Sequence, residues 1–100
     1  MQLKMLNGCR TGDAKLTKGY NLPAQYVIHT VGPVWRGGRA NEAVTLADCY
    51  ANSLTIARDL GLATIAFPAI STGIYAYPLE AATHVAIAAV CEFLEKNAAP

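Results

Sequence analysis

The sequence predicts a small α/β protein: a mixed sheet of about three strands with helices packed on it. Two observations carry this prediction. Strand-like and helix-like segments alternate from residue 26 onward, and 53% of the 100 residues are hydrophobic while only 15% are charged. A chain of this composition can bury one core, but it is too short for two domains. We therefore expect residues 1–100 to form a single domain.

Three segments have the pattern of strands. Residues 13–19 alternate in polarity and are followed by a turn-like Gly-Tyr-Asn-Leu-Pro sequence. Residues 26–31, Tyr-Val-Ile-His-Thr-Val, are mostly β-branched or aromatic, which is typical of a strand buried on both faces. Residues 63–70 form a short apolar run, in which Pro68 must lie near the end because it has no N–H to donate.

Two later segments predict helices. The first follows Asn41, a candidate N-cap, carries Glu42 near the positive end of its dipole, and ends before Gly61. Its expected core stripe is Ala43, Leu46, Tyr50, Leu54, Ala57 and Leu60. The second helix starts at Pro78, and its expected core stripe is Leu79, Ala82, Ala86, Val90, Phe93 and Leu94.

The order of these segments predicts their topology. Residues 26–96 read as strand, helix, strand, helix, which is a βαβα unit. Its crossover should be right-handed and its two strands parallel.

Charge and cysteine content exclude several classes of protein. The formal net charge of +1 is too small to attract nucleic acid or anionic lipid in general. The first residues lack the apolar core of a signal peptide, and the longest apolar run, residues 60–70, is too short to cross a membrane. The cysteines Cys9, Cys49 and Cys91 are odd in number and lack C-x-x-C spacing, so we expect reduced thiols in a cytoplasmic protein.

Ligands of parallel α/β sheets bind beyond the carboxyl ends of the strands, which here selects the loops at residues 32–38 and 70–78. The second loop is the better candidate. Ser71, Thr72 and Gly73 follow an apolar strand and lead toward a helix N-terminus, a place suited to phosphate oxygens. Tyr75 and Tyr77 could cover a sugar or a base. Local composition alone favours a purely structural turn, because turn residues are common at such junctions.

The sequence offers no convincing catalytic residue. It has neither a P-loop nor a dinucleotide-binding fingerprint. His29 lies within a predicted strand, where a satisfied core histidine is the commoner outcome, and His84 lies on the polar face of a helix. The aspartates lie away from both loops. We therefore predict no catalytic group, no metal site and no cofactor.

Three motifs resemble, in order, those of the macro domain. They are residues 11–17 (Thr-Gly-Asp-Ala-Lys-Leu-Thr), 22–35 (Leu-Pro-Ala-Gln-Tyr-Val-Ile-His-Thr-Val-Gly-Pro-Val-Trp) and 66–75 (Ala-Phe-Pro-Ala-Ile-Ser-Thr-Gly-Ile-Tyr). The chain is most similar to the bacterial macro domains described as O-acetyl-ADP-ribose deacetylases and ADP-ribosyl hydrolases. The resemblance implies that one loop wraps the diphosphate and distal ribose of ADP-ribose, formed by Ser71, Thr72, Gly73, Ile74 and Tyr75.

The resemblance also implies missing parts, so we expect a partial macro domain that is truncated at both ends. The family's first strand, its Asn-Ala-Ala-Asn strand end and its acidic glycine-rich loop have no counterpart here, nor do its last strand and helix. One missing strand would lie between residues 26–31 and 63–70. The resulting slot would have to close by direct pairing, be filled by another chain or a second copy, or leave the polypeptide poorly folded.

Ala76 is a smaller departure, since the family commonly has glycine there. If the backbone at this position has a positive φ, the methyl group costs about 1 to 2 kcal/mol.

These observations support three hypotheses about function. The leading one is binding of ADP-ribose or a derivative through residues 71–75, without catalysis by this chain alone. The second is O-acetyl-ADP-ribose deacetylase or ADP-ribosyl hydrolase activity, if a partner chain supplies the acidic loop or if the native start lies upstream. The third is an inert or interaction fragment.

Overall fold

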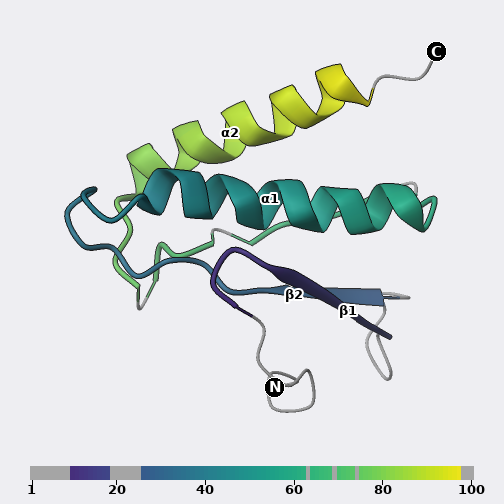
Figure 1. The fold of residues 1–100 in the computed structure, drawn as a ribbon, viewed down its shortest axis with the longest axis horizontal. Coiled ribbons are helices and arrows are strands. Elements are labelled where there is room, and N and C mark those ends of the chain that lie inside the picture. The colour runs from purple at the N-terminus through teal and green to yellow at the C-terminus, as the bar shows by residue number, and fades with distance from the viewer. Residues whose placement is uncertain (1–9, 19–25, 63, 69, 74, 98–100) are drawn as a thin grey trace.

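The computed structural model describes residues 10–18, 26–62, 64–68, 70–73 and 75–97. They form strands β1 (Ala14–Lys18) and β2 (Tyr26–Thr30), followed by helices α1 (Glu42–Asp59) and α2 (Leu79–Lys96). Figure 1 shows three layers, in which α1 lies between the two strands and α2. The fold is the α/β class that the sequence predicts.

The two strands form an antiparallel pair. Ala14 lies opposite Thr30, Leu16 opposite Ile28, and Lys18 opposite Tyr26. Both strands lie within the segments predicted for them, because alternating and β-branched residues favour a pleated, partly buried conformation. One edge of β2 is therefore occupied by β1.

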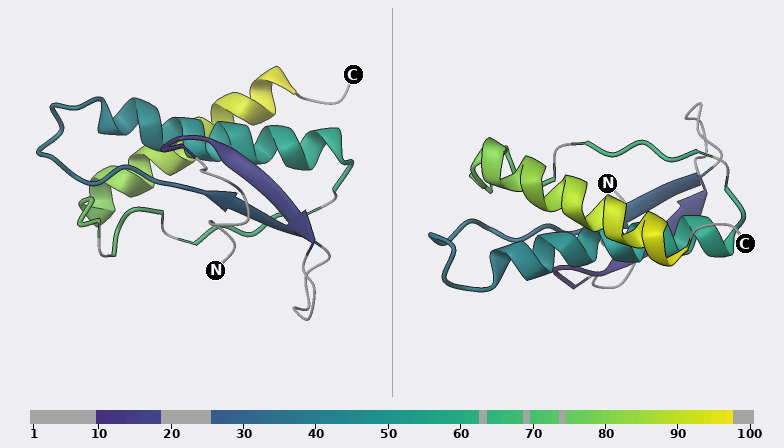
Figure 2. Two further views of the ribbon diagram at one scale, coloured as in Figure 1. Left: turned by 60° about the horizontal axis from the view of Figure 1, so that its bottom comes forward. Right: turned by 90° about the horizontal axis from the view of Figure 1, so that it is seen from above.

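The prediction of a third strand is not confirmed. Residues 64–68 have no regular secondary structure, and the described sheet has two strands. Ala63 and Ala69, at the ends of the predicted strand, lie outside the described residues. Figure 2 shows the segment between the helices running apart from the sheet. The predicted parallel βαβα pairing is absent from the described residues, because a strand needs a neighbour for its backbone hydrogen bonds.

Helix α1 provides most of the buried core. Leu46, Tyr50, Leu54 and Ala57 are buried as predicted. The core residues predicted for the two ends of this helix were wrong, since Ala43 is exposed and Leu60 is 44% exposed. Gly61 ends the helix with a φ of 69°, in the left-handed conformation expected after a helix. At the other end Asn41 is the N-cap residue but makes no side-chain capping bond.

Helix α2 packs on α1 rather than on the two strands, within the part of the chain that the structure describes. Ala82 is buried, and Ala86, Val90 and Phe93 are partly buried, as predicted. Leu79 and Leu94 were assigned to the core wrongly, since they are 64% and 59% exposed. With only one helix as a neighbour, α2 buries a narrower stripe than a sheet would cover.

Candidate ligand site

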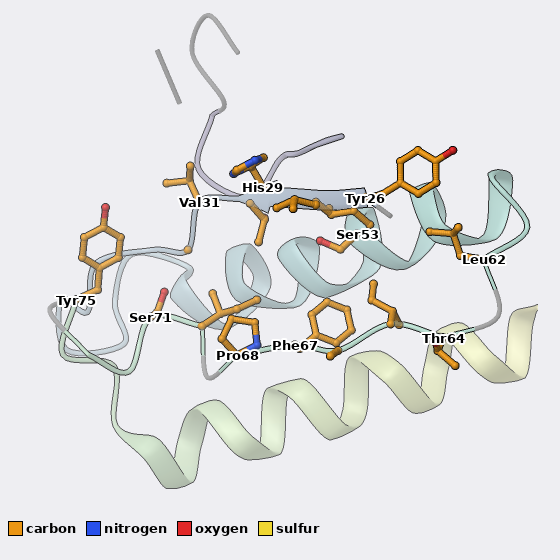
Figure 3. Close-up of a pocket in the computed structure, with 17 residues that line it drawn as sticks. Tyr26, His29, Val31, Ser53, Leu62, Thr64, Phe67, Pro68, Ser71 and Tyr75 are labelled. Carbon is orange, nitrogen blue, oxygen red and sulfur yellow. The ribbon is translucent and has the colours of Figure 1, made fainter. Parts of the chain in front are cut away.

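A cavity of about 830 Å³ separates β2 from the segment that follows α1. Figure 3 shows its two walls, one running from Tyr26 to Val31 and the other from Thr64 to Ser71. In Figure 3 the chain runs from right to left in both walls, from Tyr26 to Val31 and from Thr64 to Ser71. The floor includes Ser53 of α1. A cavity, called the slot below, therefore lies between the two segments, and its walls are not paired with each other in the described residues.

The predicted phosphate loop lies at one end of this slot. Ser71 and Tyr75 line it, and in Figure 3 both labels stand at the end where Val31 closes the β2 wall. Thr72 instead lines a second, smaller cavity of about 40 Å³ beside Tyr50 and α2. Gly73 is exposed to solvent. Ile74 lies outside the described residues.

Backbone hydrogen bonds fold this loop tightly. The N–H of Tyr77 donates to the carbonyl of Ser71 at 2.9 Å, and the N–H of Ala76 donates to the carbonyl of Gly73 at 2.9 Å. The N–H of Trp35 donates to the carbonyl of Tyr75 at 2.8 Å, which ties the loop to residues 32–38. Among the described residues, the N–H groups of Gly73 and Tyr75 donate to no protein acceptor. They stay available to a ligand.

Two non-glycine residues of the loop have left-handed backbones. Ser71 has a φ of 68° and Ala76 has a φ of 60°. This conformation costs an L-residue about 1 to 2 kcal/mol, so the loop is held in a strained shape by its surroundings. The expectation that Ala76 occupies a position suited to glycine is confirmed.

Gly32, just after β2, lets the two walls meet at the loop end. A Cβ atom at Gly32 would collide with Ser71 Oγ and would stand 2.6 Å from Cγ2 of Ile70. The Ser71 hydroxyl is buried and has no hydrogen-bond partner in the described structure. An unpaired buried hydroxyl costs about 1 to 3 kcal/mol, which favours binding of a group that can pair with it.

Glu42 organises the neighbouring loop, a role that the sequence reasoning missed. Its carboxylate is 2% exposed and accepts hydrogen bonds from the N–H groups of Arg36, Gly38 and Ala40, at 2.8, 2.9 and 2.6 Å. Desolvation by burial acts to raise the pKa of Glu42, but the backbone N–H groups outweigh it and lower the pKa to about 2. The signal that could have revealed this role is an acidic residue directly after a glycine-containing loop.

Aromatic side chains connect this loop to the candidate site. The rings of Trp35 and Tyr77 lie 4.7 Å apart between centroids. Tyr77 is buried, and burial followed by the charge of Glu42 raises the pKa of its phenol. Tyr75 is 37% exposed, so of Tyr75 and Tyr77 it is Tyr75 that offers a ring to a ligand at the slot. Trp35 stands close enough to the loop to report on its environment.

The two histidines and two of the aspartates lie on the strands and helices. His29 Nε2 is 3.0 Å from the Thr17 hydroxyl across the strand pair, and His84 is exposed on α2. Asp48 and Asp59 are exposed on α1. The described residues contain no cluster of side chains able to hold a metal ion. None of the described helices is long and apolar enough to cross a membrane.

Comparison with known proteins identifies the family. The Macro domain family matches residues 1–86, so the chain belongs to the Macro domain family and has an α/β macro-domain fold. A Macro domain-containing protein of Methanosarcina mazei is 59% identical over 99 residues, covering 99% of this chain and 53% of that protein. The O-acetyl-ADP-ribose deacetylase of Citrobacter rodentium is 52% identical over 92 residues, covering 92% of this chain and 52% of the relative.

Solved macro domains match the structure as well. The Oceanobacillus iheyensis macrodomain with ADP is 39% identical and matches 97% of this chain and 52% of its own, with a TM-score of 0.87. The Trypanosoma brucei macrodomain in complex with ADP-ribose is 48% identical and matches 91% of this chain and 37% of its own, with a TM-score of 0.81. The chain thus spans about half the length of the curated relatives named above.

Proposed function

We propose that this chain binds ADP-ribose or an ADP-ribose derivative through the loop of residues 71–75. The diphosphate would lie against the N–H groups of Gly73 and Tyr75, and the Ser71 hydroxyl would gain a partner. The ring of Tyr75 would cover the distal ribose. Ile74 belongs to the proposed site by resemblance, and Thr72, which faces the other cavity, would contribute through its backbone.

One observation carries the proposal. The loop, with two N–H groups that donate to no acceptor among the described residues and a buried unpaired hydroxyl, lies at the end of the cavity of about 830 Å³. Phosphate oxygens are the acceptors that such amides favour. Supporting this choice of ligand, macro domains that match nearly all of this chain are bound to ADP and to ADP-ribose.

Catalysis by the 100 residues alone is not part of the proposal. No described carboxylate lines the slot, and the one imidazole that does, His29, contacts Thr17.

The second candidate is O-acetyl-ADP-ribose deacetylase or ADP-ribosyl hydrolase activity in the presence of a complementing polypeptide. The name of the Citrobacter rodentium relative favours it. Release of acetate from O-acetyl-ADP-ribose only after such a polypeptide is added would distinguish it from binding alone.

Calorimetric titration with ADP-ribose tests the binding proposal, with Gly73→Glu as the blocking variant. A Cβ at Gly73 meets no atom within 4 Å, and its φ is not in the left-handed range, so the variant should fold. Its carboxylate would repel the diphosphate and abolish the heat of binding. Ala88→Glu, at an exposed position of α2, adds the same charge elsewhere and should bind normally.

Equal binding by wild type and Gly73→Glu would refute the site. Absence of binding by the wild type, with the chain folded, would favour the interaction-fragment hypothesis.

We also propose a single domain over residues 1–100, no affinity for nucleic acid and a cytoplasmic location. Cys49 and Cys91 form no disulfide in the described structure, which suits a reducing compartment. The nearly balanced charge supports the absence of nucleic-acid binding.

A further inference from the structure

The loop of residues 35–41 is folded around the Glu42 carboxylate. Three of its residues have left-handed backbones, Gly37, Gly38 and Asn41, with φ of 81°, 83° and 58°. This backbone brings three N–H groups of the loop to one point, where they donate to the carboxylate at 2.6 to 2.9 Å. The shape of the loop therefore depends on an acceptor with two oxygens at residue 42.

Trp35 connects this loop to the proposed ligand loop by its ring and by its backbone. A Cβ atom at Gly38 would stand 3.2 Å from Cη2 of Trp35, so the indole lies against the turn that Glu42 holds. The same indole lies 4.7 Å from the ring of Tyr77, between centroids. The Trp35 N–H donates to the Tyr75 carbonyl at 2.8 Å. Movement of the turn would therefore disturb the contacts of Trp35 with Tyr75 and Tyr77.

Tyr75 and Tyr77 in turn determine the shape of the ligand loop. The Tyr77 N–H donates to the carbonyl of Ser71, and the buried Tyr77 ring anchors the end of the loop. Tyr75 supplies one of the two N–H groups proposed to bind the diphosphate, and its carbonyl is the group that Trp35 holds. Groups already in position bind more tightly, because ordering them on binding costs free energy.

We propose that Glu42 is a positioning residue of the nucleotide site, which holds residues 71–77 in their binding conformation through Trp35. This inference rests on the binding of ADP-ribose proposed above and adds a residue that does not touch the ligand. Glu42 is 2% exposed and does not line the slot, so it acts through the loop of residues 35–41.

A purely electrostatic role of Glu42 would have the opposite effect on binding. The charge of Glu42 reaches the neighbouring loop, because after burial it is this charge that raises the pKa of the Tyr77 phenol. The same charge would repel a diphosphate bound nearby, so its removal alone would strengthen binding. Loss of positioning would weaken binding. The sign of the change in affinity therefore distinguishes the two roles.

Glu42→Gln removes the charge with almost no change in side-chain size. Oε2 of Glu42 accepts from the N–H groups of Arg36 and Gly38, and Oε1 accepts from that of Ala40. A glutamine has a single acceptor oxygen, so its NH₂ group must face at least one of these N–H groups, a donor against a donor. Loss of a hydrogen bond to a charged acceptor should shift the loop toward open conformations by about tenfold or more.

The first measurement is amide hydrogen exchange of the 100-residue chain without ligand. In Glu42→Gln, exchange should become about tenfold faster or more at the Trp35 amide, which reports the link, and at the Tyr77 amide, which reports the ligand loop. The second measurement is calorimetric titration with ADP-ribose. The dissociation constant should rise by about tenfold or more, because only the positioned fraction of molecules binds.

A second variant breaks the same link without changing the charge. Gly38→Ala places a methyl group 3.2 Å from Cη2 of Trp35 at a residue with a φ of 83°, in an exposed loop that should leave the rest of the chain folded. It should give the same pair of changes in exchange and affinity. If Glu42→Gln unfolds, this variant alone decides.

Two control variants separate positioning from general effects. Glu92→Gln makes the same chemical change at an exposed position of α2, and Ala88→Gly lowers the helix propensity of α2 without touching either loop. Both should leave the dissociation constant for ADP-ribose as it is in the wild type.

Two results would overturn the proposal: unchanged exchange at Trp35 and Tyr77 in the folded variants, or equal or tighter binding of ADP-ribose by them. A wild type that does not bind ADP-ribose would refute the nucleotide proposal instead. The exchange measurement needs no ligand and still decides whether Glu42 positions the loop, so the two failures are distinguishable.

Discussion

Replacing Ala76 with glycine should stabilise the protein. Ala76 has a φ of 60°, which costs an L-residue about 1 to 2 kcal/mol. Glycine removes this cost but loses about 0.4 to 1 kcal/mol more conformational entropy on folding. The side chain of Ala76 is exposed, and the N–H of residue 76 can still donate to the carbonyl of Gly73. The net gain should therefore be about 1 kcal/mol.

Thermal unfolding followed by circular dichroism measures this gain, because about 1 kcal/mol corresponds to a rise in Tm of roughly 4 to 8 °C in a domain of this size. The control is Ala88→Gly, the same substitution at an exposed position in the middle of α2. It should destabilise by about 1 kcal/mol, since glycine is a poor helix former. An unchanged or lower Tm for Ala76→Gly, with the control behaving as expected, would refute the strain argument.

Three further predictions concern stability and reactivity. The pKa of Glu42 is lowered to about 2 in the folded chain, below its value in the unfolded chain. The ionised carboxylate therefore stabilises the fold at pH values above the unfolded pKa. This stabilisation is lost as the pH falls from about 5 toward 2. Glu42→Gln should lower the stability at pH 7 and flatten this pH dependence in urea unfolding; an unaltered profile would contradict the role of the carboxylate. Gly32→Ala should destabilise the protein by about 1 to 3 kcal/mol, because the new methyl group meets Cγ2 of Ile70 at 2.6 Å. An unchanged midpoint of urea unfolding would contradict this, because it would show that Ile70 and Ser71 can move to accommodate the methyl group. In peptide mapping after brief treatment with a thiol reagent, exposed Cys91 should be labelled while Cys49, 0% exposed, should react only after unfolding; early labelling of Cys49 would contradict its burial.

The sequence was sufficient for the elements whose partners lie within it. β1 and β2 pair with each other, so the alternation of residues 13–19 and the β-branched run from Tyr26 were reliable signals. The periodic face of α1 was equally informative, since its neighbours are present. The positive φ of Ala76 was anticipated from a family pattern rather than from local composition.

The remaining features depend on tertiary context. Residues 64–68 have a strand-like composition, but strand structure also requires a neighbour, and none is hydrogen-bonded to them in the described chain. Leu79 and Leu94 are exposed because periodicity identifies an apolar face without saying what covers it. Glu42 followed the rule for helix N-termini, yet its carboxylate binds three loop amides, a contact that helix periodicity cannot predict.

The central claim is that residues 71–75 bind the diphosphate of ADP-ribose, and the most direct test is amide NMR of the 100-residue chain during titration with ADP-ribose. Binding at this loop should give saturable shifts of the Gly73 and Tyr75 amides, which donate to no described protein acceptor. The amide of Trp35 should change as well, because it donates to the Tyr75 carbonyl. Shifts confined to other parts of the fold, with the amides of Gly73 and Tyr75 unmoved at saturation, would contradict it.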